Sequence, residues 1–399
     1  MALNELPNLR HLSIAHHIGK HHGFSAASKA VNLSPSAITQ AMRSLERQLG
    51  TEIFDRSPSG AFPNEMGRVY LDRISRAFEA LRLAESVIEP DQKHIDIKSR
   101  LSISQLRAFI AVCACGSYSL AARRLGLSQP SVYKSARSVE IAFDRKLLRP
   151  SYSGVDPTPK AKEFSRFASI ALSEIERAQE EVQEQQGLMS GRLAIGSLPL
   201  VRTRVLPNAV TSLMQDFNHA KVQIFDGVYS DLLNSLRHGD LDILLGALRT
   251  PLPVNDIEQE HLFYDALNVI VRADHPILDV DRPTIRDLMQ LDWIVPRTGT
   301  PTRDYFEHLI PDQANADGSR HIECSSLVAI RALLLASHRA TVLSAHQAGY
   351  EISNHDLAVV NIQLPRSRRP IGITTRANWK PTRIQREFLT RLKAETSTL

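Results

Sequence analysis

Basic side chains are the groups in this sequence that are dense enough to bind another molecule. Residues 101–162 carry ten Lys and Arg but only three Asp and Glu, whereas the whole chain of 399 residues has a net charge of +5. A positive surface of this density attracts phosphate groups and releases counterions from a duplex. The ten side chains are Arg107, Arg123, Arg124, Lys134, Arg137, Arg145, Lys146, Arg149, Lys160 and Lys162. This segment is therefore a candidate phosphate-binding surface.

Other kinds of chemical site find little support. His17 and His21 are four residues apart, as a metal-binding pair could be, but no Cys or nearby acidic residue completes a tetrahedral set. Cys324 lacks a nucleophile-elbow motif and a recognisable base, and Cys113 and Cys115 lack the spacing of a zinc or redox site. No glycine-rich nucleotide-binding motif is present. We predict no metal, no cofactor and no enzymatic activity.

Composition predicts a soluble protein of several domains. A hydrophobic share of 43% supports sizeable cores, and 399 residues are enough for about two to four domains. No apolar run approaches the ~18 residues of a membrane span, and the N-terminal residues show no export signal. We therefore expect no contact with a membrane. Three free thiols suit a reducing compartment, so we expect the protein to be cytoplasmic.

An internal repeat at an offset of 94 residues contains the basic segment. Ser34 aligns with Ser128, and Glu46 with Glu140, without a gap. Each copy predicts a short helix, a small-residue helix, a turn and a third helix, for which Ser128 is a suitable N-cap. The third helices have matching inward faces, formed by Ile38, Met42, Leu45, Val132, Ala136 and Val139. The pattern predicts two winged helix-turn-helix modules, at residues 1–65 and 101–160.

The outward face of each third helix supplies the predicted DNA contacts. Arg and Lys suit guanine edges or phosphates, Gln40 can pair with adenine, and Ser and Tyr suit phosphate oxygens. Arg56 falls where a wing would touch the DNA backbone. The predicted DNA-binding residues are Ser34, Ser36, Thr39, Gln40, Arg43, Arg56, Ser128, Gln129, Ser131, Tyr133, Lys134, Arg137 and Arg149. The alternative is that these residues form only solvated faces.

A long helix is predicted after each module, at residues 66–90 and 161–187. Apolar residues spaced three and four apart form a seam, with charged flanks that include Arg73 and Glu174. Such a seam indicates pairing with another helix, and a homodimer is the simplest source of one. The predicted dimerisation residues are Tyr70, Ile74, Leu81, Ile88, Phe164, Ala171, Ile175 and Val182. The alternative is that each helix only caps its own module.

Residues 191–399 have a different pattern. Short apolar segments such as 193–196 and 222–225 alternate with helical stretches such as 206–217. Alternating strands and helices predict α/β layers with parallel strands.

Motifs in both copies of the repeat point to one protein family. Residues 116–132, GSYSLAARRLGLSQPSV, closely resemble the DNA-binding motif of LysR-type transcriptional regulators, and the first copy resembles it through Leu33-Ser34 and Leu45-Glu46. The first copy has Ser34-Pro35-Ser36 where the family shows Ser-Gln-Pro, and the second has Tyr133 where Ser or Thr is usual. Family members ordinarily carry one such module. The duplication leaves open whether both copies bind DNA.

Residues 191–399 resemble the effector domain of the same family. The likeness runs through Gly191-Arg192-Leu193, His275-Pro276 and Arg376-Ala377-Asn378-Trp379. The resemblance implies an α/β fold with two lobes, like that of periplasmic binding proteins, in which the chain crosses twice between lobes. We place the crossings near Val271 and Leu364, so that lobe 1 covers about 191–271 and 364–399, and lobe 2 about 272–363.

A small effector is expected beyond the carboxyl ends of the strands, where helix N-termini favour anions. Hydroxyl groups and bare amides there suit a small carboxylate or a neutral polar metabolite. The predicted effector-binding residues are Ser197, Leu198, Gly246, Ala247, Thr298, Gly299, Thr300, Ser325 and Ser326. The alternative is that the Ser and Thr side chains are only helix N-caps.

The resemblance implies a transcriptional regulator of LysR type that binds double-stranded DNA as a homodimer or tetramer. A small effector between the lobes would control it, and it would act on RNA polymerase. One alternative is a small-molecule-binding assembly module whose helix-turn-helices contact proteins. Another is an architectural DNA binder that needs no effector.

Overall fold

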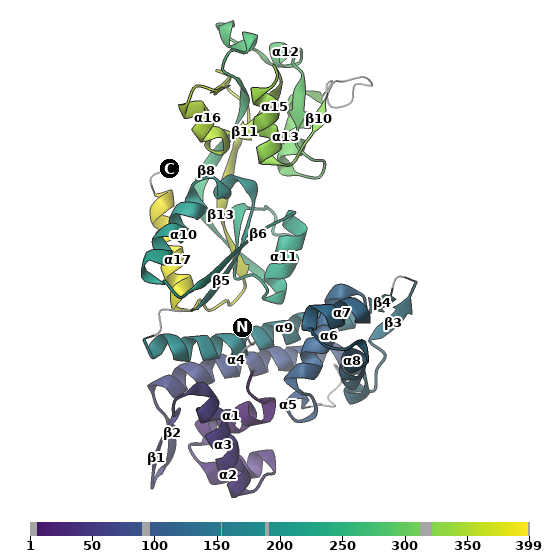
Figure 1. The fold of residues 1–399 in the computed structure, drawn as a ribbon, viewed down its shortest axis with the longest axis vertical. Helices are drawn as coiled ribbons and strands as arrows, with labels where there is room; N and C mark the ends of the chain where they lie inside the picture. Colours follow the sequence, from purple (N-terminus) through teal and green to yellow (C-terminus); the bar gives the residue numbers. More distant parts are fainter. Residues whose placement is uncertain (1–5, 90–95, 153, 188–190, 312–320, 398–399) are drawn as a thin grey trace.

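A computed structural model describes residues 6–89, 96–152, 154–187, 191–311 and 321–397. A helical N-terminal half is followed by a C-terminal half built on one long sheet (Figure 1). Within these ranges, no helix is both long enough and apolar enough to cross a membrane.

The N-terminal half contains the same series of elements twice. The first module has helices α1 (Leu9–His21), α2 (Phe24–Val31) and α3 (Pro35–Leu49), the hairpin β1 (Phe54–Ser57) and β2 (Gly60–Pro63), and then helix α4 (Glu65–Ile88). The second module has α6 (Ile103–Cys115), α7 (Tyr118–Leu125), α8 (Gln129–Phe143), β3 (Leu148–Ser151) and β4 (Gly154–Pro157), and then α9 (Pro159–Gln185). A short helix, α5 (Ile97–Arg100), lies between them. Each element of the second series begins 94 residues after its counterpart, which is the offset seen in the sequence.

Local sequence explains the third helix of each module. Ser34 Oγ accepts a hydrogen bond from Ala37 N at 3.3 Å, and Ser128 Oγ accepts one from Ser131 N at 3.4 Å. Each cap satisfies an amide that has no partner inside the helix. The predicted inward faces are fully buried, as are Ala27 and Ala121 of the preceding helices, where a small side chain allows close packing.

A backbone contact holds each hairpin against the first helix of its module. Val155 N donates to Gly116 O at 2.7 Å, and Ala61 N donates to His22 O at 3.0 Å. Gly154 has a φ of +140°, and a Cβ atom there would lie 2.5 Å from Gly116 O. The hairpin can approach this closely only because residue 154 has no side chain.

We expect Gly154→Ala to lower the free energy of unfolding by about 2 kcal/mol or more, because the methyl group adds a clash to a strained backbone. Gly126→Ala is the matched control: Gly126 also has a positive φ, +65°, but no described atom lies within 4 Å of the added Cβ. It should cost only roughly 1 kcal/mol. Urea unfolding measures both, and equal losses would show that the hairpin moves away freely.

The two long helices pair with each other within one chain. Their seam residues are at most 1% exposed, and they bury one another along α4 and α9. The pair is antiparallel: Arg73 near the start of α4 bonds Glu181 near the end of α9, while Lys160 at the start of α9 bonds Ile88 O at the end of α4. The prediction that these seams pair two chains is therefore wrong, because the repeat supplies the matching seam in the same chain. The residues that were predicted to form a dimer interface, and that instead pack within the chain, are Tyr70, Ile74, Leu81, Ile88, Phe164, Ala171, Ile175 and Val182.

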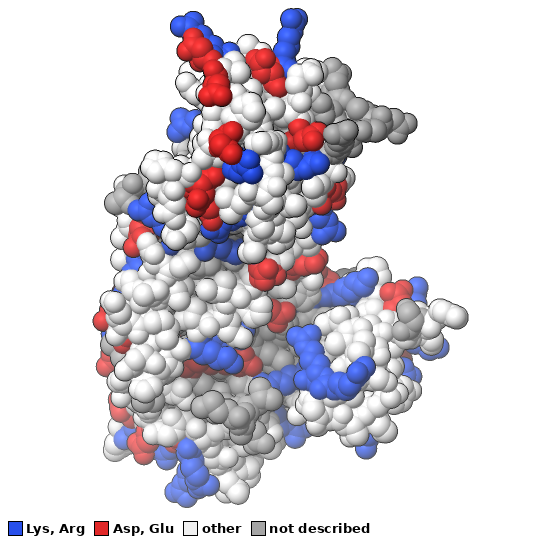
Figure 2. All heavy atoms as spheres, turned by 45° about the horizontal axis from the view of Figure 1, so that its top comes forward, with Lys and Arg blue, Asp and Glu red and all other residues white. Residues whose placement is uncertain are grey.

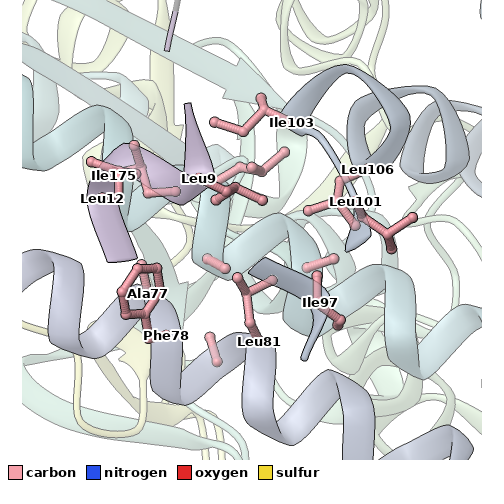
Figure 3. Packing of buried hydrophobic residues seen from close by; sticks show 14 of the residues in the cluster. Leu9, Leu12, Ala77, Phe78, Leu81, Ile97, Leu101, Ile103, Leu106 and Ile175 are labelled. Carbon is pink, nitrogen blue, oxygen red and sulfur yellow. The ribbon is translucent and has the colours of Figure 1, made fainter. Parts of the chain in front are cut away.

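Both modules and both long helices share one hydrophobic core. It runs from Leu9 of α1 through Leu81 of α4 and Leu106 of α6 to Ile175 of α9 (Figure 3). The intervening helix α5 contributes Ile97, which is fully buried. The predicted divisions between modules and linker helices thus run through a single core, and the modules are fixed relative to each other.

The C-terminal half has two lobes joined by two strands. Lobe 1 contains the parallel strands β5 (Arg192–Ser197), β6 (Lys221–Asp226) and β7 (Ile243–Ala247), with η1 (Pro199–Arg202), α10 (Val205–Asp216), α11 (Tyr229–His238) and α17 (Arg383–Thr396). Lobe 2 contains the parallel strands β9 (Trp293–Val295), β10 (Ile322–Glu323) and β11 (Ala340–Ser344), with β12 (Leu357–Val359), η2 (Pro276–Asp279), α12 (Ile285–Leu288), α13 (Pro301–Leu309), α15 (Leu327–Leu335), η3 (Ala345–Ala348) and α16 (Gly349–Ser353). The connecting strands are β8 (Ile257–Arg272) and β13 (Arg368–Arg376).

The sheet order is β10-β9-β11-β8-β13-β7-β5-β6, with β12 on β8. β8 pairs with β13 as far as Ala266 and with β11 from Leu267, so the first crossing lies there, and the chain returns at Arg368. Both points lie within a few residues of the predicted crossings. Parallel pairing holds inside each lobe, but β8 and β13 are antiparallel to their neighbours, so the sheet is mixed.

Candidate nucleic-acid interface and effector domain

The second module exposes basic side chains around its third helix, α8. Tyr133, Lys134 and Arg137 are exposed, whereas Val132 and Val139 on the opposite face are buried. Figure 2 shows Lys and Arg side chains gathered on this module, which projects at the lower right. The surface has the charge that phosphate binding needs.

Six of the ten basic side chains in residues 101–162 form no hydrogen bond or ion pair with another described residue. They are Arg123, Arg124, Lys134, Lys146, Arg149 and Lys162. The other four have partners inside the chain: Arg107 bonds Glu176, Arg137 bonds Glu140, Arg145 bonds Glu89, and Lys160 bonds Ile88 O. The six unpaired cations are the ones available for phosphate groups.

The first module offers fewer free groups. Gln40 and Arg43 of α3 are exposed, and neither has a hydrogen bond or ion pair to another described residue. Thr39 is half-buried and donates to Pro35 O at 3.0 Å, while the hydroxyls of Ser34 and Ser36 lie 3.0 Å apart. Of the predicted DNA-binding residues on this helix, Gln40 and Arg43 are therefore the ones that remain free to contact bases.

The start of α8 is held by its own polar residues. Ser128 Oγ lies 2.8 Å from Ser131 Oγ, and Gln129 Oε1 accepts a hydrogen bond from Ser119 Oγ at 2.8 Å. Tyr133 packs edge-on against the Tyr118 ring and stays half exposed. These predicted DNA-binding residues lie together at one helix start, and their contact with DNA remains a prediction.

A buried glutamate fixes one arginine in each module. Glu46 accepts a hydrogen bond from Arg56 Nη2 at 2.8 Å, and Glu140 accepts one from Arg137 Nη1 at 2.6 Å. Arg56 and Arg137 therefore stabilise their own modules. Their side chains keep 40% and 45% of their surface exposed, so DNA contact by either stays a prediction.

A buried network of charged side chains joins the helix pair to lobe 1. Arg73 of α4 bonds Glu174 at 2.9 Å and Glu181 at 2.8 Å on α9, and Arg177 of α9 bonds Asp242 of lobe 1 at 2.5 Å. All five residues are less than 10% exposed. Burial opposes ionisation of Glu174, but the guanidinium groups of Arg177 and Arg73 hold its pKa below the usual value. Part of the predicted charged flanks of the seams, including Arg73, Glu174 and Arg177, is therefore a buried network, which is stable only while its partners are present.

Lobe 1 also contacts both long helices at its surface. Arg76 Nη2 of α4 donates to Asn378 O at 2.5 Å, Lys380 pairs with Asp72 at 2.5 Å, and Arg166 of α9 pairs with Asp256 at 3.1 Å. A movement of lobe 1 would therefore displace contacts with both α4 and α9, the helices to which the two modules are attached.

Glu180 of α9 makes the stability of the folded chain depend on pH. Burial raises the pKa of its carboxyl group to about 7, against a smaller opposing effect of Arg177, while Asp242 and Glu176 add to the rise and Arg192 opposes it. Since the folded state holds a proton that the unfolded state has released, this group's contribution to stability falls as pH rises from about 4.5 through about 7.

We expect Glu180→Gln, which mimics the neutral acid, to be more stable than the natural chain at pH 8 by on the order of 1–2 kcal/mol. The difference should shrink toward about pH 5. Urea unfolding across this range measures it, with the exposed Glu52→Gln as control. A difference that does not depend on pH would contradict a raised pKa of the half-buried Glu180.

The predicted effector residues divide into buried and exposed positions. Ser197 is fully buried, and its Oγ donates to Phe225 O at 3.4 Å, so it presents no surface to a ligand. Gly246 is also buried, and a Cβ atom there would lie 2.5 Å from the Leu198 side chain. The prediction that Ser197 and Gly246 bind the effector is therefore wrong, because both residues pack inside lobe 1. Leu198 and Ala247 are half-buried beside them.

In lobe 2, two predicted residues are helix caps. Thr300 Oγ1 accepts a hydrogen bond from Arg303 N at 3.2 Å at the start of α13, and Ser326 Oγ accepts one from Ala329 N at 3.4 Å at the start of α15. Thr298 is exposed and donates to Glu323 at 3.1 Å. Gly299 and Ser325 are exposed. The alternative interpretation as caps thus holds for Thr300 and Ser326.

Sequence reasoning missed the arginines between the lobes. Arg249 follows β7, lies 4.5 Å over the Tyr229 ring, and forms no hydrogen bond or ion pair with another described residue. Burial lowers its pKa, with further effects from Tyr229, Arg369 and Asp304 of lobe 2. Arg369 of β13 bonds both Asp265 and Thr302 at 3.1 Å. Arg249 is therefore a half-buried guanidinium without a hydrogen-bond or ion-pair partner among the described residues, and Asp304 of lobe 2 is near enough to affect its pKa.

The structure contains a cavity of about 690 Å³ in a different place. It lies at the base of the two modules and is lined by uncharged polar groups such as Asn8, Gln48, Ser102 and Gln183. None of the predicted effector residues borders it.

The histidine cluster of α1 packs against neighbouring side chains. His16 Nδ1 lies 3.3 Å from Ser75 Oγ, and burial lowers the pKa of His16 to about 4. The His17 and His21 rings stack with centroids 6.0 Å apart. In the described part of the chain, no group of three or more His, Cys, Asp and Glu could hold a metal ion.

Comparisons with known proteins agree with this arrangement. The family model for the LysR substrate binding domain matches residues 186–397, and the one for bacterial regulatory helix-turn-helix proteins of the lysR family matches residues 9–68 and 103–162. The transcriptional regulator GalR of Pseudomonas putida is 27% identical over 373 residues, 94% of this chain and 93% of the relative, so this alignment includes both modules.

Shorter relatives match about three quarters of the chain. The transcriptional regulator PcaQ of Agrobacterium fabrum is 25% identical over 285 residues, 71% of this chain and 92% of the relative. Among solved structures, full-length OxyR from Pseudomonas aeruginosa is 20% identical with a TM-score of 0.55, and covers 74% of this chain and 97% of that one. At this identity the likeness shows a shared fold.

Proposed function

Because the chain belongs to the LysR family of transcriptional regulators, we propose that both of its modules bind duplex DNA and that a small carboxylate between the lobes controls this binding. The chain is a regulator with DNA-binding helix-turn-helix segments and an effector-binding domain, and it is not an enzyme. The proposal concerns which groups bind DNA and effector.

Unpaired basic and polar side chains on both third helices carry the DNA-binding part. Lys134 and Arg149 of the second module, and Gln40 and Arg43 of the first, are exposed and have no hydrogen-bond or ion-pair partner among the described residues. Such groups can bind phosphate or base edges without first breaking a contact inside the protein. A protection footprint on the DNA upstream of the gene, with and without a bound carboxylate, tests both halves of the proposal. A footprint that no carboxylate alters would contradict the effector half.

Arg249 supports a carboxylate as effector. Its guanidinium is half-buried, has no ion-pair partner among the described residues, and is near enough to Asp304 of lobe 2 for that carboxylate to affect its pKa. A planar guanidinium can bind a carboxylate through two hydrogen bonds, and burial strengthens them. Closure of the lobes on such a ligand would move lobe 1 on the α4–α9 pair, to which it is joined by buried charges.

We expect Arg249→Gln to weaken carboxylate binding at least 10-fold, because the ligand loses a charge-assisted hydrogen bond. Isothermal calorimetry against a panel of small carboxylates measures this. Arg282→Gln, an exposed arginine of lobe 2, is the control and should bind as the natural chain does. Equal affinity of Arg249→Gln and the natural chain would place the ligand elsewhere.

Association between chains needs a surface other than the seams, since these are used within the chain. β6 is the last strand of the sheet and exposes Ile224 and Phe225, with the exposed Val228 following. An apolar edge strand is suited to pairing with a second copy, and we infer a homodimer through this edge. Control of transcription in the cytoplasm would then require contact with RNA polymerase.

A further inference from the structure

We propose that a single chain is a complete DNA-binding unit whose two modules contact different half-sites, so that its operator is asymmetric. This inference rests on the proposed binding of DNA. It concerns which module meets which part of the operator and how many chains one pair of half-sites requires.

The antiparallel helix pair sets the separation of the modules. The first module is attached at the start of α4 and the second at the start of α9, and these starts lie at opposite ends of the pair. α4 has 24 residues, which span roughly 36 Å at the rise of an α-helix. One turn of duplex DNA is about 34–36 Å. The modules are thus attached about one helical turn of DNA apart.

The shared core keeps this separation constant. Arg10 of α1 donates to Ser99 O at 2.8 Å, and Ile97 of α5 is fully buried between the modules. Leu9 of the first module and Leu106 of the second belong to the same apolar cluster as both long helices (Figure 3). A rigid pair of modules on one chain needs no second chain to fix the spacing of two half-sites.

The two modules differ at the positions that face DNA. Gln40 of α3 corresponds to Lys134 of α8 at the repeat offset of 94, and both are exposed without hydrogen bonds or ion pairs to described residues. Glutamine pairs with adenine, whereas lysine binds guanine or phosphate. Two modules with these side chains cannot prefer the same bases.

The hairpins differ in the same sense. Asp55 of β1 corresponds to Arg149 of β3, so the first hairpin has an acidic residue where the second has an unpaired arginine. In addition, the buried glutamates bind different arginines. Glu46 binds the hairpin residue Arg56, so Arg43 of the third helix has no partner among the described residues. Glu140 binds Arg137 of the third helix, so the hairpin residue Arg149 has no such partner. The second half-site is therefore bound with the larger phosphate contribution, and the first depends more on its bases.

Base-resolved footprints of the full chain on its own upstream DNA test this inference. The variants are Gln40→Ala and Lys134→Ala. The matched controls are Gln215→Ala and Lys221→Ala, which remove an exposed Gln or Lys from lobe 1. We expect Gln40→Ala to lose base contacts in one half-site only and Lys134→Ala in the other only. Each loss should weaken binding by roughly 5- to 100-fold. The footprint should keep one orientation, and at saturation the complex should contain one chain for each duplex limited to two half-sites, whether or not the chains are paired through β6.

Several results would overturn the inference. If either variant affects two symmetric half-sites, the operator is a palindrome bound by two chains. If Lys134→Ala leaves the footprint and affinity unchanged, the second module does not contact bases. In both cases the natural chain still binds DNA selectively, so its proposed role as a DNA-binding regulator stands, although the second result removes Lys134 from the proposed DNA contacts. If the natural chain binds no DNA selectively, the proposed function and the inference fail together.

The spacing gives an independent readout. Inserting about 5 base pairs between the half-sites turns one of them to the opposite face of the duplex. We expect a loss of binding to the level of a single half-site. Unchanged affinity would show that the modules move independently and that the shared core does not fix them.

Discussion

Replacing Arg73 by leucine is expected to lower the free energy of unfolding by about 3–5 kcal/mol. Arg73 is fully buried and bonds Glu174 and Glu181, so the change removes the ion-pair partner of Glu181 and one of the three arginines that pair with Glu174. Removing one member of a buried ionic network costs more than the pair contributes, because the remaining charges stay desolvated. Urea unfolding followed by circular dichroism measures the loss.

Arg82→Leu is the matched control, since it is the same substitution on the same helix. Arg82 pairs with Glu79 at the exposed surface, and its loss should change stability little. The loss of unfolding free energy in Arg73→Leu should also become smaller as pH falls toward about 5. Buried carboxyl groups without a partner take up protons at a higher pH in the folded state than in the unfolded state. A deficit that is equal at pH 5 and pH 8 would point to a packing defect instead of uncompensated charge.

The second large effect is expected from the unpaired cations of the second module. A variant in which four of them become glutamine should bind operator DNA on the order of 100- to 1000-fold more weakly at physiological salt. The plot of log affinity against log salt concentration should become shallower by about 3–4, since each phosphate contact contributes about 0.9. The four substitutions are Arg123→Gln, Arg124→Gln, Lys134→Gln and Arg149→Gln. Fluorescence anisotropy at several salt concentrations measures both quantities.

A control with the same change in net charge separates contact from long-range attraction. It replaces four exposed basic residues of the C-terminal lobes, Lys221→Gln, Arg282→Gln, Arg286→Gln and Arg366→Gln. Charges farther than about 10 Å from the duplex are largely screened, so this variant should keep nearly the full salt slope. Equal slopes in the two variants would mean that the second module makes no phosphate contacts.

Local patterns were sufficient to predict the modules. The cap at Ser128 and the inward face with Val132 and Val139 follow from side-chain type and helical spacing within one turn or two, and the structure confirms them. Several strands of the lobes, such as β5 and β6, were also predictable, because each contains a short apolar run bounded by turns, but the short strands β10 and β12 were not predicted.

The partner of each seam could not be predicted from the same patterns. Heptad spacing shows that a helix needs a partner, but it does not say whether the partner lies in the same chain. The complementary charges that select the intrachain pair, Arg73 and Glu181, are 108 residues apart. Their burial follows from the antiparallel packing of α4 and α9, which no local window contains.

Two of the predicted effector residues, Ser197 and Gly246, were wrong for a related reason. The end of a strand marks the edge of a sheet but not the direction of the side chain, and Ser197 at the end of β5 points into the packed interior of lobe 1. Arg249 lies two residues beyond β7, and its surroundings include Asp304 from the other lobe. A site assembled from two lobes depends on contacts that a single segment of sequence does not carry.

Selective DNA binding is tested most directly by titrating the full chain into a labelled fragment of its own upstream region between about 50 and 200 mM salt. An unrelated fragment of equal length is titrated in parallel. We expect the upstream fragment to bind at least about 1000-fold more tightly, with affinity for both fragments falling steeply as salt increases. Equal affinity for the two fragments, or no binding even at the lowest salt, would contradict the role assigned to the two modules.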